Sequence, residues 1–231
     1  MCIFSKVLCV IIAQLLFPQT LKTLAIEFRH EYSEGGSIEA VKGTVYYLAP
    51  TKVILKVTSP INQWMVLKGK EMTIYYPDEN MGFYIVSQSP ISLPFFEAFI
   101  GAIKEDYGLT DIGYTLSNHE IRGDTLFTYW SPPKKLSKVL RKLTLVHISN
   151  KLTYTELKGT DGTIISKSFY SDHIRYGAIY FPLKITTIRY IKTDSIIEKV
   201  VYSNPQFNIS LPQEITNFKI PLDAEVKEIK W

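Results

Sequence analysis

The chain has 231 residues, with 26 basic and 22 acidic side chains and a formal net charge of +4. This length fits one large β domain or two small ones, and the weak charge, with no run of four basic residues, argues against nucleic-acid binding. Both cysteines, Cys2 and Cys9, lie at the start. The rest of the chain therefore offers no disulfide, thiol catalysis or cysteine metal site.

Residues 1–25 differ in composition from the remainder. The basic residue Lys6 is followed by the apolar stretch Val7–Phe17, and Thr23-Leu24-Ala25 then offers a small residue before Ile26. A basic start, a short apolar core and a small-residue exit are typical of a secretory signal peptide. The apolar core has about 11 residues, against the roughly 20 that span a bilayer. We predict a cleaved signal peptide over residues 1–25 and one exported, periplasmic domain over residues 26–231.

The first part of that domain alternates between β-forming runs and turn residues. Val, Ile, Thr, Tyr and Phe fill the runs, and Pro, Gly, Asn and Asp occupy the breaks, which is typical of strands joined by tight turns. Several of these strands are apolar on both faces, which predicts a covered sheet or a barrel with an apolar interior. In chain order the predicted strands are Ile38–Leu48, Lys52–Thr58, Gln63–Leu67, Glu71–Tyr76 and Gly82–Gln88.

The segment from Pro94 to Asp106 breaks this pattern. Proline suits the first turn of a helix, and the apolar residues that follow lie at helical spacing. We therefore predict a helix here, lying across the mouth or the inner face of the sheet. The residues of its apolar stripe are Phe95, Phe96, Phe99, Ile100 and Ile103.

Strand-like runs then resume. The Asp161-Gly162 pair between two of these runs is a strong hairpin signal. About a dozen strands joined by short loops predict a mainly β domain with few helices, built as a meander that curls on itself. The predicted strands of this part are Tyr114–Ile121, Thr125–Ser131, Lys138–Ile148, Leu152–Lys158, Thr163–Ser171, Leu183–Ile191 and Ile196–Ser203.

Catalytic and metal-binding motifs find little support in the sequence. The four histidines, His30, His119, His147 and His173, lack a second ligand at metal-like spacing. A Gly-x-Ser-x-Gly elbow and a phosphate-binding glycine loop are also missing. We predict that the chain is not an enzyme and uses neither a metal nor a cofactor.

The informative feature is the aromatic content, with 15 Tyr, 12 Phe and 3 Trp. A dry cavity lined by aromatic and aliphatic side chains would bind acyl chains by burying them, at about 0.8 kcal/mol for each methylene. The predicted lining assumes that one particular face of each strand points inward, because a slip of one residue exchanges the faces. The predicted lining residues are Val53, Leu55, Trp64, Val66, Ile74, Phe83, Ile85, Phe95, Phe99 and Ile103.

A set of short elements lies along the chain from Gly43 onward and is densest over residues 43–106. The elements are Gly43, Pro50, Pro60 with Gln63, Gly69, Tyr75-Tyr76-Pro77, Ser89-Pro90 before the helix, and near the end Phe207, Pro212 and a last strand close to Ile220. In these elements the sequence resembles the LolA-like family of periplasmic outer-membrane lipoprotein carriers. In two places the sequence departs from the family, since Leu48-Ala49 stand before Pro50 in place of the usual arginine, and a long N-terminal helix is hard to see.

The resemblance implies an unclosed antiparallel β half-barrel lidded by helices. It implies a hydrophobic cavity that takes acyl chains of lipoproteins, or another lipid, from an inner-membrane exporter to an outer-membrane acceptor, and a monomeric protein. Two alternatives stay open. A non-catalytic regulatory or structural module that binds a protein partner would have a filled core and an exposed apolar patch or edge strand. A hydrolase would bring histidine and carboxylate groups together in one pocket.

Overall fold

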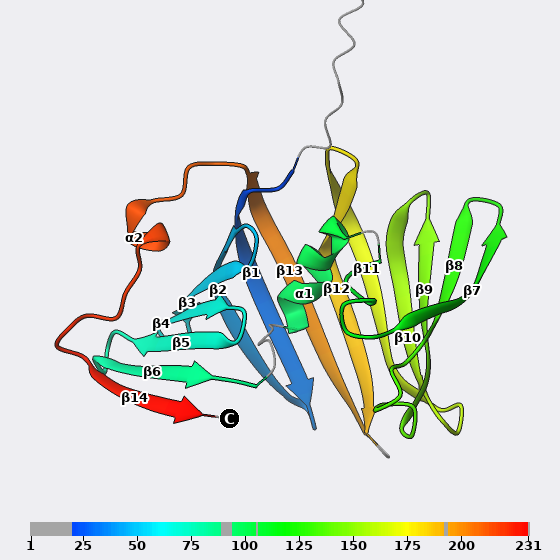
Figure 1. Cartoon of the computed structure of the whole chain (residues 1–231), viewed down its shortest axis with the longest axis horizontal. Helices are drawn as coiled ribbons and strands as arrows, with labels where there is room; N and C mark the ends of the chain where they lie inside the picture. Colours follow the sequence, from blue (N-terminus) through cyan, green and yellow to red (C-terminus); the bar gives the residue numbers. More distant parts are fainter. Residues whose placement is uncertain (1–19, 89–93, 105, 192–193, 231) are drawn as a thin grey trace, which may run out of the picture.

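The computed structural model describes residues 20–88, 94–104, 106–191 and 194–230. The predicted leader residues 1–19 and the Ser89-Pro90 pair lie outside them. The described strands form one sheet of 14 strands, in the order β14-β6-β5-β4-β3-β2-β1-β13-β12-β11-β10-β9-β8-β7 (Figure 1). Strands β14 and β7 end the sheet at opposite sides, so the sheet is unclosed, as predicted.

Two antiparallel meanders build most of this sheet. The first consists of β1 (Thr23–Glu34), β2 (Ser37–Leu48), β3 (Lys52–Ser59), β4 (Gln63–Lys68), β5 (Glu71–Tyr76) and β6 (Met81–Val86). The second consists of β7 (Thr115–Arg122), β8 (Thr125–Ser131), β9 (Leu140–Ile148), β10 (Lys151–Gly159), β11 (Ile164–Tyr176), β12 (Ile179–Ile191) and β13 (Asp194–Phe207). Antiparallel pairing of β1 with β13 joins the two meanders. The predicted strands from residue 38 to residue 203 all occur, with ends displaced by a few residues.

Strand β1 was not predicted as a strand, and it begins inside the segment predicted as leader. Thr23, Leu24 and Ala25 already pair with β2. The side chain of Leu24 is fully buried, and that of Leu21 is nearly so. The folded part of the chain therefore begins no later than Leu21, and a cut after Ala25 would remove part of the core.

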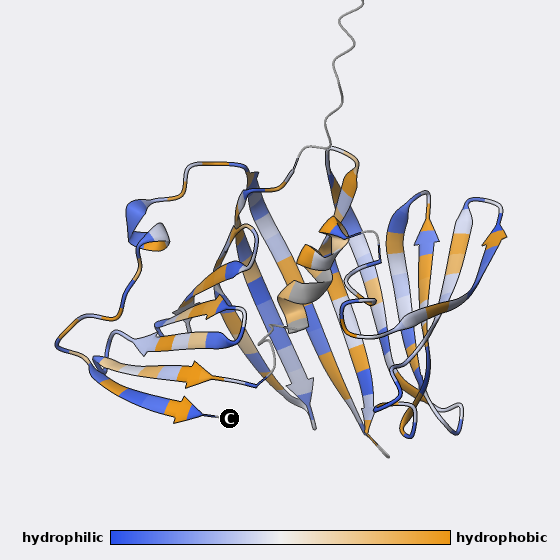
Figure 2. Cartoon of the chain, viewed as in Figure 1, coloured by the Kyte–Doolittle hydropathy of each residue, from blue (hydrophilic) through white to orange (hydrophobic). Residues whose placement is uncertain are grey.

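One face of the sheet is concave and carries a short helix, α1 (Pro94–Ile100), continued by one 3-10 turn (Gly101–Ile103) (Figure 1). The helix ends before the predicted Asp106 because Lys104 is extended and Tyr107 and Gly108 have positive φ angles of 56° and 75°. Hydrophobic and hydrophilic residues alternate along the long strands behind it (Figure 2), so that one set faces α1. This packing forms the main hydrophobic core.

The opposite, convex face carries a C-terminal strap, defined as residues 208–224. The strap includes the short helix α2 (Gln213–Thr216) and leads to β14 (Glu225–Lys230), which pairs with β6 in parallel. The ring of Phe218 stacks on Trp64 with centroids 4.6 Å apart. The predicted last strand near Ile220 is wrong in position, because Ile220 lies in the strap before Pro221, and the strand begins at Glu225.

Candidate ligand-binding site

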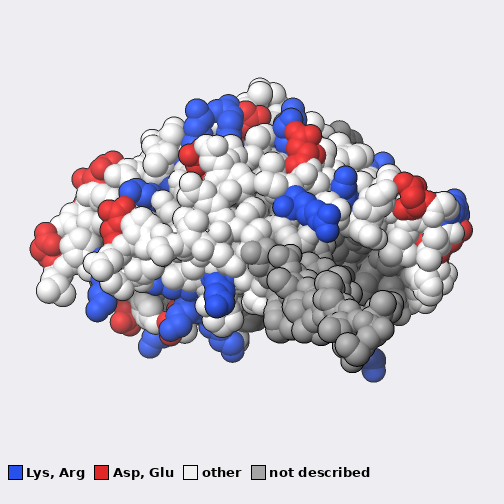
Figure 3. Space-filling model, turned by 90° about the horizontal axis from the view of Figure 1, so that it is seen from above, with Lys and Arg blue, Asp and Glu red and all other residues white. Residues whose placement is uncertain are grey.

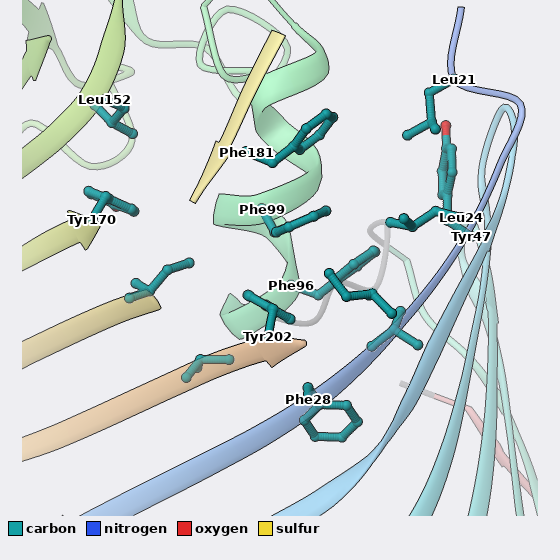
Figure 4. Packing of buried hydrophobic residues seen from close by; sticks show 14 of the residues in the cluster. Leu21, Leu24, Phe28, Tyr47, Phe96, Phe99, Leu152, Tyr170, Phe181 and Tyr202 are labelled. Atoms are coloured by element: carbon teal, nitrogen blue, oxygen red, sulfur yellow. The ribbon is translucent and has the colours of Figure 1, made fainter. Parts of the chain in front are cut away.

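Helix α1 is held on the concave face by stacked aromatic rings. The ring of Phe99 lies 4.9 Å from that of Phe181 and 4.8 Å from that of Tyr202 (Figure 4). The ring of Phe95 stacks on that of Phe28 at 5.1 Å. The buried hydroxyl of Tyr202 donates a hydrogen bond to the Phe95 carbonyl at 2.5 Å, and burial raises the pKa of Tyr202. The helix thus fills the centre of the face and leaves space at its sides.

Two pockets, each lined by both apolar and polar side chains, lie beside the 3-10 turn that follows α1. One has a volume of about 390 Å³ between this turn and strands β8, β9 and β12, and its apolar walls include Leu126, Trp130, Leu145 and Ile179. The other has a volume of about 380 Å³ and lies toward β2 and the loop after it. Ile103 lines both pockets. Their volumes fall within the range of small-molecule sites, about 300–1,000 Å³.

The charged side chains at the first of these pockets are held by partners. Lys104 forms an ion pair with Asp111, and the Asp106 carboxylate accepts hydrogen bonds from the Gly108 amide and from Thr110. The ring of His147 lies 5.6 Å from that of Tyr107, whose pKa is raised to about 12 by burial. Burial also lowers the pKa of His147. An apolar ligand would therefore meet neutral rings, one ion-paired lysine and one hydrogen-bonded carboxylate.

A third pocket, of about 190 Å³, lies at the start of α1 against strands β11, β12 and β13. Its wall carries an ion pair between Arg189 and Glu198 at 2.6 Å and a hydrogen bond between the hydroxyls of Ser168 and Thr187 at 2.9 Å. The Glu198 side chain is only 13% exposed. Sequence reasoning missed this cluster because its members lie on three strands. One sequence signal could have found it. Thr187 and Arg189 follow the inward-facing Ile185 at every second position, and Glu198 lies two residues before the inward-facing Val200.

Eight of the ten predicted lining residues point toward the concave side. The strand residues among them are Val53, Leu55, Ile74, Phe83 and Ile85, and the helical residues are Phe95, Phe99 and Ile103. Of the eight, Phe95 and Ile103 line the pockets described above. Phe99 is fully buried in the core, and Ile74, Phe83 and Ile85 belong to a smaller cluster near the β6 edge.

The placement of Trp64 and Val66 in the cavity is wrong. The β3–β4 register pairs Leu55 with Met65 and Val53 with Leu67, so Met65 and Leu67 are the inward residues of β4. Trp64 instead points to the convex face, where it packs against Phe218 of the strap. The β3–β4 turn reverses the parity that the prediction assumed, and such a slip exchanges the two faces of a strand.

Charge and metal chemistry give no competing site in the described part of the chain. Basic and acidic side chains are interspersed on the face shown in Figure 3. Residues 20–88, 94–104, 106–191 and 194–230 contain no group of three or more His, Cys, Asp or Glu side chains placed to hold a metal ion. The helices in these ranges are all too short or too polar to cross a membrane.

Comparison with known proteins finds similarity in structure only. No family model matches the sequence, and no curated protein matches it. A LolA superfamily protein from Nitrosomonas europaea superposes with a TM-score of 0.56 and 15% identity, over 84% of this chain and 90% of that chain. A DUF1329 family protein from Desulfovibrio piger gives a TM-score of 0.59 at 13% identity, over 85% and 90%.

A putative outer membrane lipoprotein-sorting protein domain from Vibrio parahaemolyticus is similarly close. It gives a TM-score of 0.58 at 9% identity, over 89% of this chain and 94% of that chain. Similarity at this level of identity concerns the fold. The protein therefore has a LolA-like fold, and the resemblance noted in the sequence is confirmed at that level.

Proposed function

Starting from the LolA-like fold, we propose that the protein is a periplasmic carrier that binds lipoprotein acyl chains, or another lipid, on its concave face and delivers them toward the outer membrane. The observation that carries this proposal is the concave face itself. It is apolar, it is covered by one short helix, and it holds pockets of about 390 and 380 Å³ beside that helix. The lipoprotein-sorting description of the Vibrio parahaemolyticus domain supports the same direction.

Burial of hydrocarbon would supply the binding energy. Each methylene that leaves water for these pockets contributes about 0.8 kcal/mol, so a chain of eight methylenes would gain about 6 kcal/mol before the cost of ordering it. No polar group needs to react for such binding. An inner-membrane exporter would load the monomeric carrier and an outer-membrane acceptor would unload it, after a leader that ends before Leu21 has been removed.

A non-enzymatic role agrees with the arrangement of the polar groups. Nucleophilic catalysis requires a hydroxyl or thiol within hydrogen-bonding reach of a base. The hydroxyl of Ser168 bonds to that of Thr187, and the ring of His173 bonds through Nε2 to the Leu152 carbonyl at 2.7 Å. The Ser168 hydroxyl and the His173 ring are thus each engaged with another partner.

A second candidate function is a regulatory or structural module that binds a protein partner. Two observations favour it. Phe96 and Phe99 of α1 already fill the centre of the concave face. Strand β7 lies at the edge of the sheet, and its side chains Leu116 and Ile121 are 52% and 69% exposed. A free edge with apolar side chains can pair with another chain.

Native mass spectrometry with lipid extraction separates the two functions. The full-length protein, purified from a membrane-containing lysate, should carry acyl species if it is a carrier. The variant Ile103→Lys places a charge in both pockets beside the 3-10 turn and should lose the acyl species. Phe169→Lys, on the convex face where Phe169 is half exposed, is the matched control and should retain them. Protein that emerges free of lipid and takes up no fluorescent acyl probe would instead support the partner-binding module.

A further inference from the structure

The pocket at the start of α1 differs chemically from the rest of the concave face. Phe95, Ile185 and Val200 give it apolar walls, but Arg189 and Glu198 place a pair of opposite charges beside them. The Glu198 side chain is only 13% exposed while that of Arg189 is 45% exposed, so it is the burial of the carboxylate that costs free energy of desolvation. A ligand made only of hydrocarbon would form no favourable interaction with these charges, so it does not account for their presence.

The charges of this pocket cancel each other. Arg189 is bonded to Glu198 through atoms 2.6 Å apart, and these two residues are the charged side chains among those that line the pocket. A ligand anion entering here would find the cation already engaged and would approach the Glu198 carboxylate. The pocket therefore disfavours a free carboxylate or phosphate.

Neutral hydrogen-bonding groups surround the same space. The hydroxyls of Ser168 and Thr187 bond to each other and each retains further capacity. The ring of His30 does not line the pocket itself but stacks on its wall residue Phe95 at 5.3 Å. Within the described residues its buried Nε2 has no hydrogen-bond partner, since the nearest Glu198 oxygen is 3.9 Å away. Burial lowers the pKa of His30, so this ring is neutral near pH 7.

We propose that this pocket is a polar subsite for an uncharged linkage, an ester or an amide, that joins an acyl chain to its carrier molecule. The inference rests on the proposed function and adds a substrate class to it. Ser168 and Thr187 bind the carbonyl and its neighbours, while Phe95 and Val200 contact the first methylenes. The protein accordingly prefers acylated neutral molecules to free fatty-acid anions.

Displacement of an uncharged fluorescent probe tests this selectivity. Monomyristoylglycerol and myristate have the same chain and would be compared at pH 8, below their micelle concentrations. The neutral lipid should displace the probe at a concentration about tenfold lower, which corresponds to about 1.4 kcal/mol. In Glu198→Gln the Arg189 charge loses its partner, and the preference should shrink to about twofold or reverse.

A matched control exists on the other face of the sheet. Arg29 and Glu31 form a similar ion pair at 2.7 Å on the convex side of β1, so Glu31→Gln changes the same charge and should keep the wild-type preference. Arg189→Gln removes the cation instead and should weaken myristate further, which keeps the test available if Glu198→Gln does not fold.

Three results would overturn the inference. The first is equal displacement of the probe by both lipids in the wild type, and the second is an unchanged preference in a folded Glu198→Gln or Arg189→Gln protein. Either result would refute the subsite without refuting the carrier function. Displacement by neither lipid removes the carrier function together with the subsite.

Discussion

A chain that starts at Ile26 should fail to fold stably, whereas a chain that starts at Thr20 should fold. The difference between them is the segment 20–25. Leu21 and Leu24 are both buried in the main core. Asn208, the first residue after β13, fixes the same segment, because its side chain accepts a hydrogen bond from the Lys22 amide at 2.7 Å and donates one to the Thr20 carbonyl at 3.0 Å.

The size of the effect follows from these contacts. Burial of one leucine side chain contributes about 1.5–3 kcal/mol, and each hydrogen bond contributes about 0.5–1.5 kcal/mol. Removing both leucines and the two Asn208 bonds therefore costs about 4–9 kcal/mol. A domain has about 5–15 kcal/mol in total, so the shorter chain loses a large part of its stability. At about 2–4 °C per kcal/mol for a domain of this size, Tm should fall by about 8–36 °C or the transition should disappear.

Circular dichroism and urea denaturation of residues 20–231 and 26–231 measure this directly. Within the longer chain, Leu24→Ala should cost about 2–5 kcal/mol, while Lys22→Ala at an exposed side chain should cost little. Equal urea midpoints for the two chain lengths would refute the reasoning. Under the proposed export and leader cleavage, intact mass of the mature protein should likewise place its first residue before Leu21.

Three further predictions concern α1, the strap and pH. Phe99→Ala should destabilise the fold by about 3–5 kcal/mol in urea denaturation, since the ring is fully buried, and a loss below 1 kcal/mol would mean that α1 is not docked in solution. Phe218→Ala should speed hydrogen exchange of β14 without changing lipid binding, because the ring contacts that it removes, with Trp64 and Tyr75, lie on the convex face. Stability should be full above about pH 6.5 and should fall as the pH drops below it, because the unfolded histidines bind protons that the folded ones resist. Thermal melts from pH 8 to pH 5 check this. The loss of stability over this range should be smaller when glutamine replaces any of the three histidines whose pKa is lowered, which are His30, His147 and His173.

Sequence reasoning placed the strands well because their ends carry explicit turn chemistry. Gly162, with a φ angle of 85°, turns the chain between β10 and β11 where Asp161-Gly162 predicts a hairpin. The α1 stripe was also correct, since Phe95, Phe96 and Phe99 all belong to the core or pack against it. Both features depend on neighbours within a few residues, which the sequence displays directly.

The errors concern relations between distant residues. Trp64 was assigned to the wrong face because strand parity depends on how the Ser59–Asn62 turn is built, and alternation within one strand does not reveal it. The pocket formed by Ser168, Arg189 and Glu198 requires the register of three strands. Neither could be read from a single run of sequence.

The missed strand β1 has the largest structural consequence. The first residues of β1 are mostly apolar and include the small residue Ala25, so they resemble the cleavage site at the end of a signal peptide. Yet β1 is the strand that pairs with β2 on one side and with β13 on the other. Through this pairing it sets Phe28 and His30 against Phe95 of the helix. Both meanders contribute to the concave face, and β1 joins them into one sheet.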